Sequence, residues 1–191
     1  LFQPTLAKVA KSFELRGRIP YWGGLPQYGT EEEVPVNVLY TVSRARKTDL
    51  GDRPLPGGVV RLFDPDSAGR LQLVGEAAIN HSAAGADLRL DAGTAFDLTA
   101  KRIQTTYSTR RDSLAPGGGW RTIATADYKV TIDNGGDQPV TVTVLEERGG
   151  EWSIVSSSVK AMKLSATRTG FALPVPAKGK ATLTYKVRVI W

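Results

Sequence analysis

The sequence predicts an all-β protein, an antiparallel β-sandwich of about ten strands. Short apolar runs alternate with polar residues at a period of two as far as the C-terminus. Turns rich in glycine and proline separate these runs at intervals of roughly 8–16 residues, a spacing typical of sandwiches and barrels. Helical periodicity is confined to one short candidate at residues 6–13, and residues 12–19 suit a strand equally well.

Residues 55–75 predict a β-hairpin. A Pro-Gly-Gly break leads into an apolar run at 59–63, and a second apolar run follows at 71–75. Residues 64–69, with two Asp, one Pro and one Gly, supply the residue types that favour a turn between two strands.

Strand patterning is clearest in the C-terminal half of the chain. Residues 181–191 place an apolar side chain at every odd position, which predicts one face against a core and the other in water. Residues 128–132, 140–144 and 152–155 repeat the pattern, with glycine pairs between them. We therefore expect these three segments to form a three-stranded meander.

The expected organisation is a β-sandwich domain at residues 36–191, preceded at residues 1–35 by an N-terminal extension or junction. The chain begins at Leu1 rather than Met, so we expect a mature or excised segment. Residues 20–35 and 110–122 are predicted as loops, and loops on a rigid scaffold are where binding residues concentrate.

Composition excludes several kinds of chemistry. The 191 residues include no cysteine, which rules out disulfides, thiolate metal sites and a cysteine nucleophile. The apolar runs have strand length, so no membrane-spanning helix is expected. The net charge of +6, from 25 Lys and Arg against 19 Asp and Glu, is spread along strands, and a nucleic-acid partner is therefore not predicted.

His81 is the only histidine, so a Ser-His-Asp triad would have to be built around it. One hypothesis is a hydrolase or metal-dependent enzyme in which His81 meets Asp64, Asp66 or Asn80. The alternative is a histidine in a turn or at a strand end. Residues 64–75 begin like a calcium loop but lack the side-chain oxygens that the loop needs at two positions. No metal and no cofactor is expected.

Two groups of residues are candidates for binding. Aromatic side chains in the first predicted loop form an exposed platform or close one end of the core. Basic side chains near the second loop, beside an aromatic residue, suit an anion or give weak polyanion binding. The candidates are Tyr21, Trp22 and Tyr28 in the first group, and Lys101, Arg102, Arg110, Arg111 and Trp120 in the second.

The order of these motifs resembles a bacterial family. The resemblance rests on the run from Leu55 to Phe63, on Ile79-Asn80-His81, on residues 93–100 and on the closing strand to Trp191, and it covers about residues 36–191. The family is the C-terminal β-rich domain of mucoidy-inhibitor-A-like proteins, a domain of unknown function. The resemblance implies a β-rich domain at the end of a longer, often exported protein, and it brings no catalytic residues.

We therefore expect a non-enzymatic binding or scaffold module of a bacterial envelope or exported protein. It would contact a protein or a cell-surface polymer through its loops or a sheet edge, and it could belong to a larger assembly. A cytoplasmic location stays open.

Overall fold

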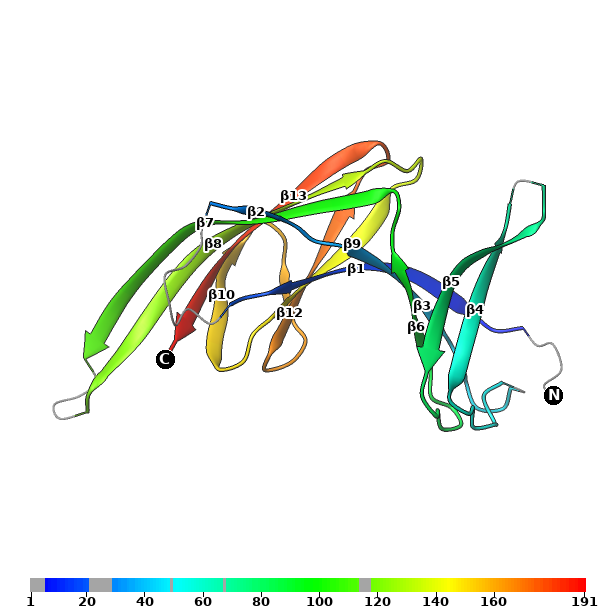
Figure 1. The fold of residues 1–191 in the computed structure, drawn as a ribbon. Coiled ribbons are helices and arrows are strands. Elements are labelled where there is room, and N and C mark those ends of the chain that lie inside the picture. Colours follow the sequence, from blue (N-terminus) through cyan, green and yellow to red (C-terminus); the bar gives the residue numbers. More distant parts are fainter. Residues whose placement is uncertain (1–5, 21–28, 49, 67, 114–117) are drawn as a thin grey trace. The chain divides into compact units, whose positions relative to one another are not determined.

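Strands make up the regular structure of this protein. The computed structural model describes residues 6–20, 29–48, 50–66, 68–113 and 118–191, and these ranges contain thirteen strands and no helix (Figure 1). The strands are β1 (Val9–Arg18), β2 (Glu31–Glu33), β3 (Val36–Val42), β4 (Gly58–Pro65), β5 (Leu71–Ile79), β6 (Leu88–Thr94), β7 (Leu98–Ser113), β8 (Trp120–Asn134), β9 (Val140–Glu147), β10 (Glu151–Ser157), β11 (Ala161–Lys163), β12 (Arg168–Val175) and β13 (Gly179–Ile190). The predicted all-β class is confirmed, with more strands than the ten expected. Part of the excess is β2 and β11, which are too short to show a period of two.

The N-terminal segment, for which the sequence suits either a helix or a strand, forms strand β1. In β1, Leu15 is buried, and Ile19 just beyond the strand is buried as well, while Arg16 and Arg18 between them are exposed. This alternation is the period of a strand rather than of a helix. The helix candidate at residues 6–13 is therefore wrong.

The chain divides into two compact units. Unit one consists of residues 1–13 and 37–95, and unit two of residues 14–36 and 96–191. One boundary between the units falls between residues 36 and 37, and the expected domain at residues 36–191 stays a prediction.

Unit one contains the hairpin that the sequence predicts. Strands β4 and β5 pair in antiparallel register from Gly58↔Ile79 to Pro65↔Leu71, with a bulge at Val74. One face of the hairpin packs on the core of the unit, which consists of Ala77, Leu88 and Leu90 with Tyr40, Val42, Leu55, Val60, Leu62 and Ile79. A Cβ at Gly75 would lie 2.9 Å from the Ala92 Cβ, so glycine allows β5 to approach β6 closely.

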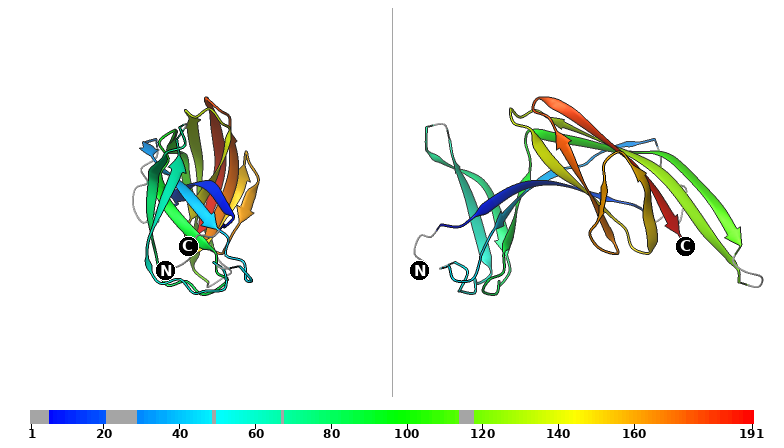
Figure 2. Two further views of the ribbon diagram at one scale, coloured as in Figure 1. Left: turned by 90° about the vertical axis from the view of Figure 1, so that its right-hand side faces the viewer. Right: turned by 180° about the vertical axis from the view of Figure 1, so that it is seen from behind.

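Unit two contains two facing layers. One is a five-stranded sheet of order β10-β13-β8-β7-β2, and the other contains β11, β12, β9 and the second part of β1 (Figures 1 and 2). Strand β13 pairs with β8 without interruption from Gly179↔Asn134 to Ile190↔Ile123. Apolar side chains from both layers are buried between them, namely Val130, Ile132, Val142, Val144, Phe171, Leu183 and Val187.

The expected meander is wrong, because its three strands do not pair in sequence. Strand β8 pairs with β7 and β13, β9 pairs with β12, and β10 pairs with β13. The turn after β8 carries the chain into the other layer. Asn134 is buried there, and its Nδ2 donates to the carbonyl oxygens of Gln138 (2.9 Å) and Pro176 (3.0 Å). These bonds fix a crossover where the sequence pattern alone suggests a hairpin.

The predicted loop at residues 110–122 is largely strand. Strand β7 continues to Ser113 and β8 starts at Trp120, and these two residues are register partners. Residues 114–117 lie outside the described part of the chain.

Candidate functional site

The basic residues predicted as an anion site do not form one cluster. Lys101 and Arg110 are separated along β7 by about 30 Å, at about 3.3 Å per residue. The Lys101 ammonium donates to Glu31 Oε1 at 2.7 Å, and this bond raises its pKa. Arg110 lies 3.5 Å from Asp112, and Arg111 is exposed on the same strand.

The aromatic candidates fall into two groups. Trp120, at the first position of β8, is exposed. Tyr21, Trp22 and Tyr28 lie outside the described residues. The platform and core-closure alternatives for these three therefore stay predictions.

Arg102 is buried, in contrast to its basic neighbours. From β7 it reaches Glu146 of β9 across the two layers of unit two, with Nε donating to Oε1 and Nη2 to Oε2, each at 3.0 Å. Glu146 has no exposed surface, and the Arg102 side chain is 7% exposed. The prediction that Arg102 contributes to an exposed anion site is thus corrected, because its charge is already paired in bidentate geometry.

Two tyrosines complete the buried network around this pair. The Tyr185 hydroxyl donates to Glu146 Oε1, and the Tyr128 hydroxyl donates to Gln104 Oε1 at 2.9 Å. The tyrosine rings stack with their centroids 5.4 Å apart, and the Arg102 guanidinium carbon lies 4.2 Å from the Tyr128 centroid. The network therefore links side chains of β7, β8, β9 and β13.

The protonation states in this network are fixed near neutral pH. Burial raises the pKa of Tyr128 to about 12, and burial together with the Glu146 carboxylate raises the pKa of Tyr185 well above its ordinary value. Burial on its own would lower the pKa of Arg102, but the Glu146 carboxylate reverses that effect and raises it. A charged arginine and two neutral tyrosines sealed from water suit a structural role better than proton transfer.

A second buried arginine organises the loops of unit one. Arg44 is fully buried, and its guanidinium donates to several groups of two segments, residues 50–53 and 82–86. The acceptors are the carbonyl oxygens of Leu50 (3.1 Å), Ala83 (3.2 Å), Ala86 (3.1 Å) and Arg53, and the Ser82 hydroxyl (2.9 Å). Arg44 therefore holds these two loop segments together.

The proposed convergence of His81 with Asp64 or Asp66 is wrong. His81 follows β5 at one end of the hairpin, where its Nδ1 accepts a hydrogen bond from the Gly57 N–H at 3.2 Å. The two aspartates lie at the other end, so roughly 20 Å of strand separates them from His81. In the described part of the chain, no group of three His, Cys, Asp or Glu residues is placed to hold a metal ion.

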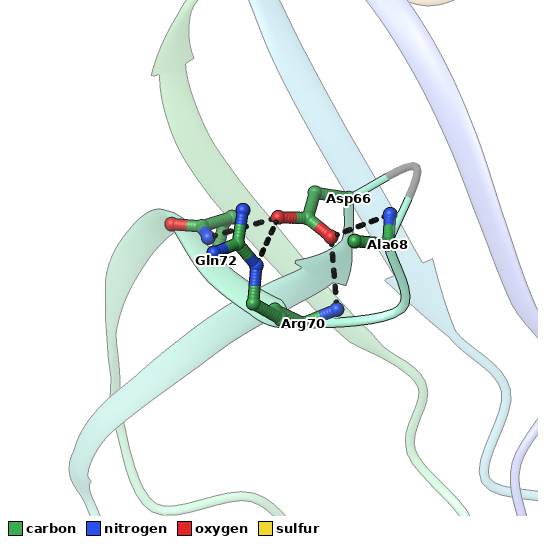
Figure 3. Close-up of polar contacts among 4 residues, drawn as sticks. All are labelled: Asp66, Ala68, Arg70 and Gln72. Carbon is green, nitrogen blue, oxygen red and sulfur yellow. Dashed lines mark hydrogen bonds and ion pairs between the residues drawn. The ribbon is translucent and has the colours of Figure 1, made fainter.

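Asp66 instead stabilises the turn of the hairpin (Figure 3). Its Oδ1 accepts the backbone N–H groups of Ala68 and Arg70, each at 2.9 Å, and its Oδ2 accepts Arg70 Nε at 3.0 Å and Gln72 Nε2 at 3.4 Å. The bond from the Arg70 backbone N–H holds the pKa of Asp66 below its ordinary value. These bonds engage both oxygens of the carboxylate, which explains the turn composition without a metal.

The outer face of the same hairpin exposes large apolar side chains. The register puts Val59 opposite Ala78, Phe63 opposite Leu73 and Pro65 opposite Leu71 on the face that does not pack on the core. Phe63 is 53% exposed, Leu73 54% and Leu71 69%. The Arg61–Glu76 pair separates Val59 from the other apolar side chains, which gather near the turn of the hairpin. Exposed apolar side chains that gather in this way mark interaction sites in soluble domains. We call these residues, with Val59 and Val74, the hairpin face.

Comparisons with known proteins give no family for this chain. Neither a family model, nor a curated protein, nor a solved structure matches it. Within the described residues there is also no helix of the length and apolarity that crossing a membrane requires.

Proposed function

We propose that this chain is a non-enzymatic binding module that takes an extended segment of a partner protein on its β4–β5 hairpin. The exposed apolar row of the hairpin face carries this proposal. Each large side chain there stays in contact with water in the free protein, and covering it would contribute about 25 cal/mol per Å² of apolar area.

The edge of β4 favours an extended partner. Strands β4 and β5 form a sheet of two strands, so within the described residues β4 has no second strand neighbour. An edge strand presents unpaired backbone N–H and C=O groups, which an added strand can satisfy. A bound strand with alternating apolar side chains would extend the surface that begins with Val59 and Phe63.

The charges on the hairpin face favour a partner segment with little net charge. In the centre of the face, Arg61 Nε lies 2.8 Å from Glu76 Oε1, so each charge is balanced on the hairpin itself. Both side chains are exposed, and this pair adds little stability to the hairpin. Charged side chains on an edge strand also limit unspecific pairing, which fits recognition of a particular sequence.

The experiment is capture of partners by the immobilised protein from extract of its source cells, at low and moderate salt. We expect a discrete protein that the wild type retains at both salt concentrations, that Phe63→Ser loses and that Leu164→Ser retains. Leu164 is a matched control because it is 55% exposed, lies in unit two and does not line the hollow on that unit's sheet. Equal retention by both variants would contradict the proposed surface, and recovery of a polysaccharide alone would contradict a protein partner.

The resemblance stated above extends the proposal to location. We place the module in a bacterial envelope or exported protein, as the C-terminal β-rich domain of a mucoidy-inhibitor-A-like protein. Fractionation of source cells with an antibody against this chain tests the location. Signal confined to the cytoplasmic fraction would contradict it.

A further inference from the structure

The outer face of the five-stranded sheet in unit two is hollowed above the middle of β8 and β13. The hollow has a volume of about 330 Å³, which reaches the range of small-molecule sites. Its lining includes Lys129, Lys186, Asp127, Ser156 and Thr184. It lies in a different unit from the hairpin face and involves none of the same residues.

The strand register brings these polar side chains together. Lys129 is the register partner of Thr184, while Lys186 is the partner of both Asp127 on one side and Ser156 on the other. Register partners on one face of a sheet have Cβ atoms about 4.5–5.5 Å apart. All five side chains therefore converge on one small area of the sheet.

The hollow has an excess of positive charge. Asp127 is engaged by its neighbours, because Oδ2 accepts the Thr106 hydroxyl at 2.5 Å and Oδ1 lies 3.6 Å from Lys186 Nζ. The structure gives the side chains of Lys129, Ser156 and Thr184 no partner within the described part of the chain. One ammonium and two hydroxyls are thus available to a ligand, beside a second ammonium whose charge is balanced.

Two bulges border the hollow at the same level of the sheet. The register of β7 against β8 shifts at Thr105, and that of β10 against β13 shifts at Val155. Thr105 also lines the hollow. Bulges re-aim side chains and are over-represented beside functional sites. Their position on both sides of one hollow is a second observation, independent of charge.

We propose that this hollow binds the anionic oxygen group, a phosphate, sulfate or carboxylate, of a small hydroxylated molecule. The Lys129 ammonium would donate to the anionic oxygens, as charge-assisted donors do in phosphate and carboxylate sites. The Ser156 and Thr184 hydroxyls both donate and accept, so they match the hydroxyl groups of a sugar-like ligand. The volume holds more than an inorganic anion, which leaves room for the hydroxylated part.

Titration of ¹⁵N-labelled protein with inorganic phosphate, glucuronate and glucose, followed by NMR, tests this site. We expect saturable shifts of the Lys129, Ser156 and Thr184 amides with glucuronate, weaker ones with phosphate and none with glucose. Lys129→Ala should weaken glucuronate binding about tenfold, the loss of one charge-assisted hydrogen bond.

Lys8→Ala is the control, since Lys8 is an exposed lysine of unit one and its loss changes the net charge equally. The proposal is overturned if the two lysine variants weaken binding equally, or if the anions shift only amides outside the hollow. It is also overturned if glucose shifts the same amides as strongly as glucuronate. The capture assay on Phe63 does not involve these residues, so the two proposals can fail separately.

Discussion

Removing one member of the buried pair Arg102–Glu146 should strongly destabilise unit two. In Glu146→Gln the side chain keeps its shape, but the Arg102 guanidinium stays buried without its counter-charge. Breaking a buried ion pair from one side costs about 3–5 kcal/mol in the free energy of unfolding. The upper part of that range applies here, because Glu146 has no exposed surface and also accepts the Tyr185 hydroxyl.

The double variant Arg102→Met/Glu146→Leu separates the charge effect from packing. Replacing a buried ion pair with apolar residues of similar volume is often neutral or stabilising. We therefore expect the double variant to lose less stability than Glu146→Gln alone. The costs of Arg102→Met and Glu146→Leu should be far from additive in a double-mutant cycle.

Urea unfolding followed by tryptophan fluorescence measures these free energies. Trp120, Trp152 and Trp191 all belong to unit two, so their emission reports on that unit. A loss below about 1 kcal/mol for Glu146→Gln, the range of an exposed ion pair, would refute the reasoning. The reasoning would also be refuted if the double variant lost as much stability as the two single variants together.

Three further predictions concern single groups. Gly17→Ala should destabilise unit two by about 1–3 kcal/mol in urea unfolding, because the new Cβ would lie 2.7 Å from the buried Cδ of Glu146. In the control Gly149→Ala the new Cβ meets nothing within 4 Å, so the free energy of unfolding should change by less than about 0.5 kcal/mol. Arg44→Lys should increase amide hydrogen exchange in unit one, since an ammonium cannot reproduce the fork of donors that joins its two loop segments; unchanged exchange would contradict this. The pKa of Tyr128 is about 12 and that of Tyr185 is also raised, whereas a tyrosine in the unfolded chain has a pKa of about 10. The two buried hydroxyls therefore contribute their full stability below pH 10, and this contribution is lost as the pH rises towards 12. Absorbance at the tyrosinate band should show tyrosines that ionise at a higher pH than the others, and Tyr128→Phe and Tyr185→Phe should each remove part of this signal.

The sequence predicts those elements in which local pattern and local structure coincide. The hairpin predicted at residues 55–75 is present as β4–β5, and the strand predicted at 181–191 is present as β13, which ends at Ile190. Alternation identifies the buried face of the strand, and the apolar runs with their turn residues identify the hairpin. In both cases the information lies within neighbouring residues.

The strands that pair with β8, β9 and β10 could not be predicted in the same way. The glycine pair after Asn134 suits a hairpin turn. The hydrogen bonds from the Asn134 side chain to the carbonyl oxygens of Gln138 and Pro176 instead fix a crossover to the other layer. Pro176 is distant in sequence, so no local pattern records this contact. The contacts of Arg44 with residues 82–86 are also between segments distant in sequence.

The buried pair did leave a signal in the sequence. Neighbouring residues on a strand point to opposite faces, so in a strand with one covered face one member of Lys101-Arg102 and one of Glu146-Glu147 faces inward. In the structure the inward members are Arg102 and Glu146, and they pair with each other. Adjacent like charges indicate a buried charge only where one face of the strand is covered, because Arg110 and Arg111 further along β7 are both exposed.

Site-specific photo-crosslinking from the hairpin face tests the proposed function most directly. A benzophenone side chain at position 63 should give one discrete protein adduct in source cells, and the same group at position 164, where the native side chain is about equally exposed, should not. Backbone amides of β4 should also gain protection from hydrogen exchange when that partner is bound. Adducts of equal yield from both positions, or a bound partner that leaves the β4 amides unprotected, would contradict strand addition on this hairpin.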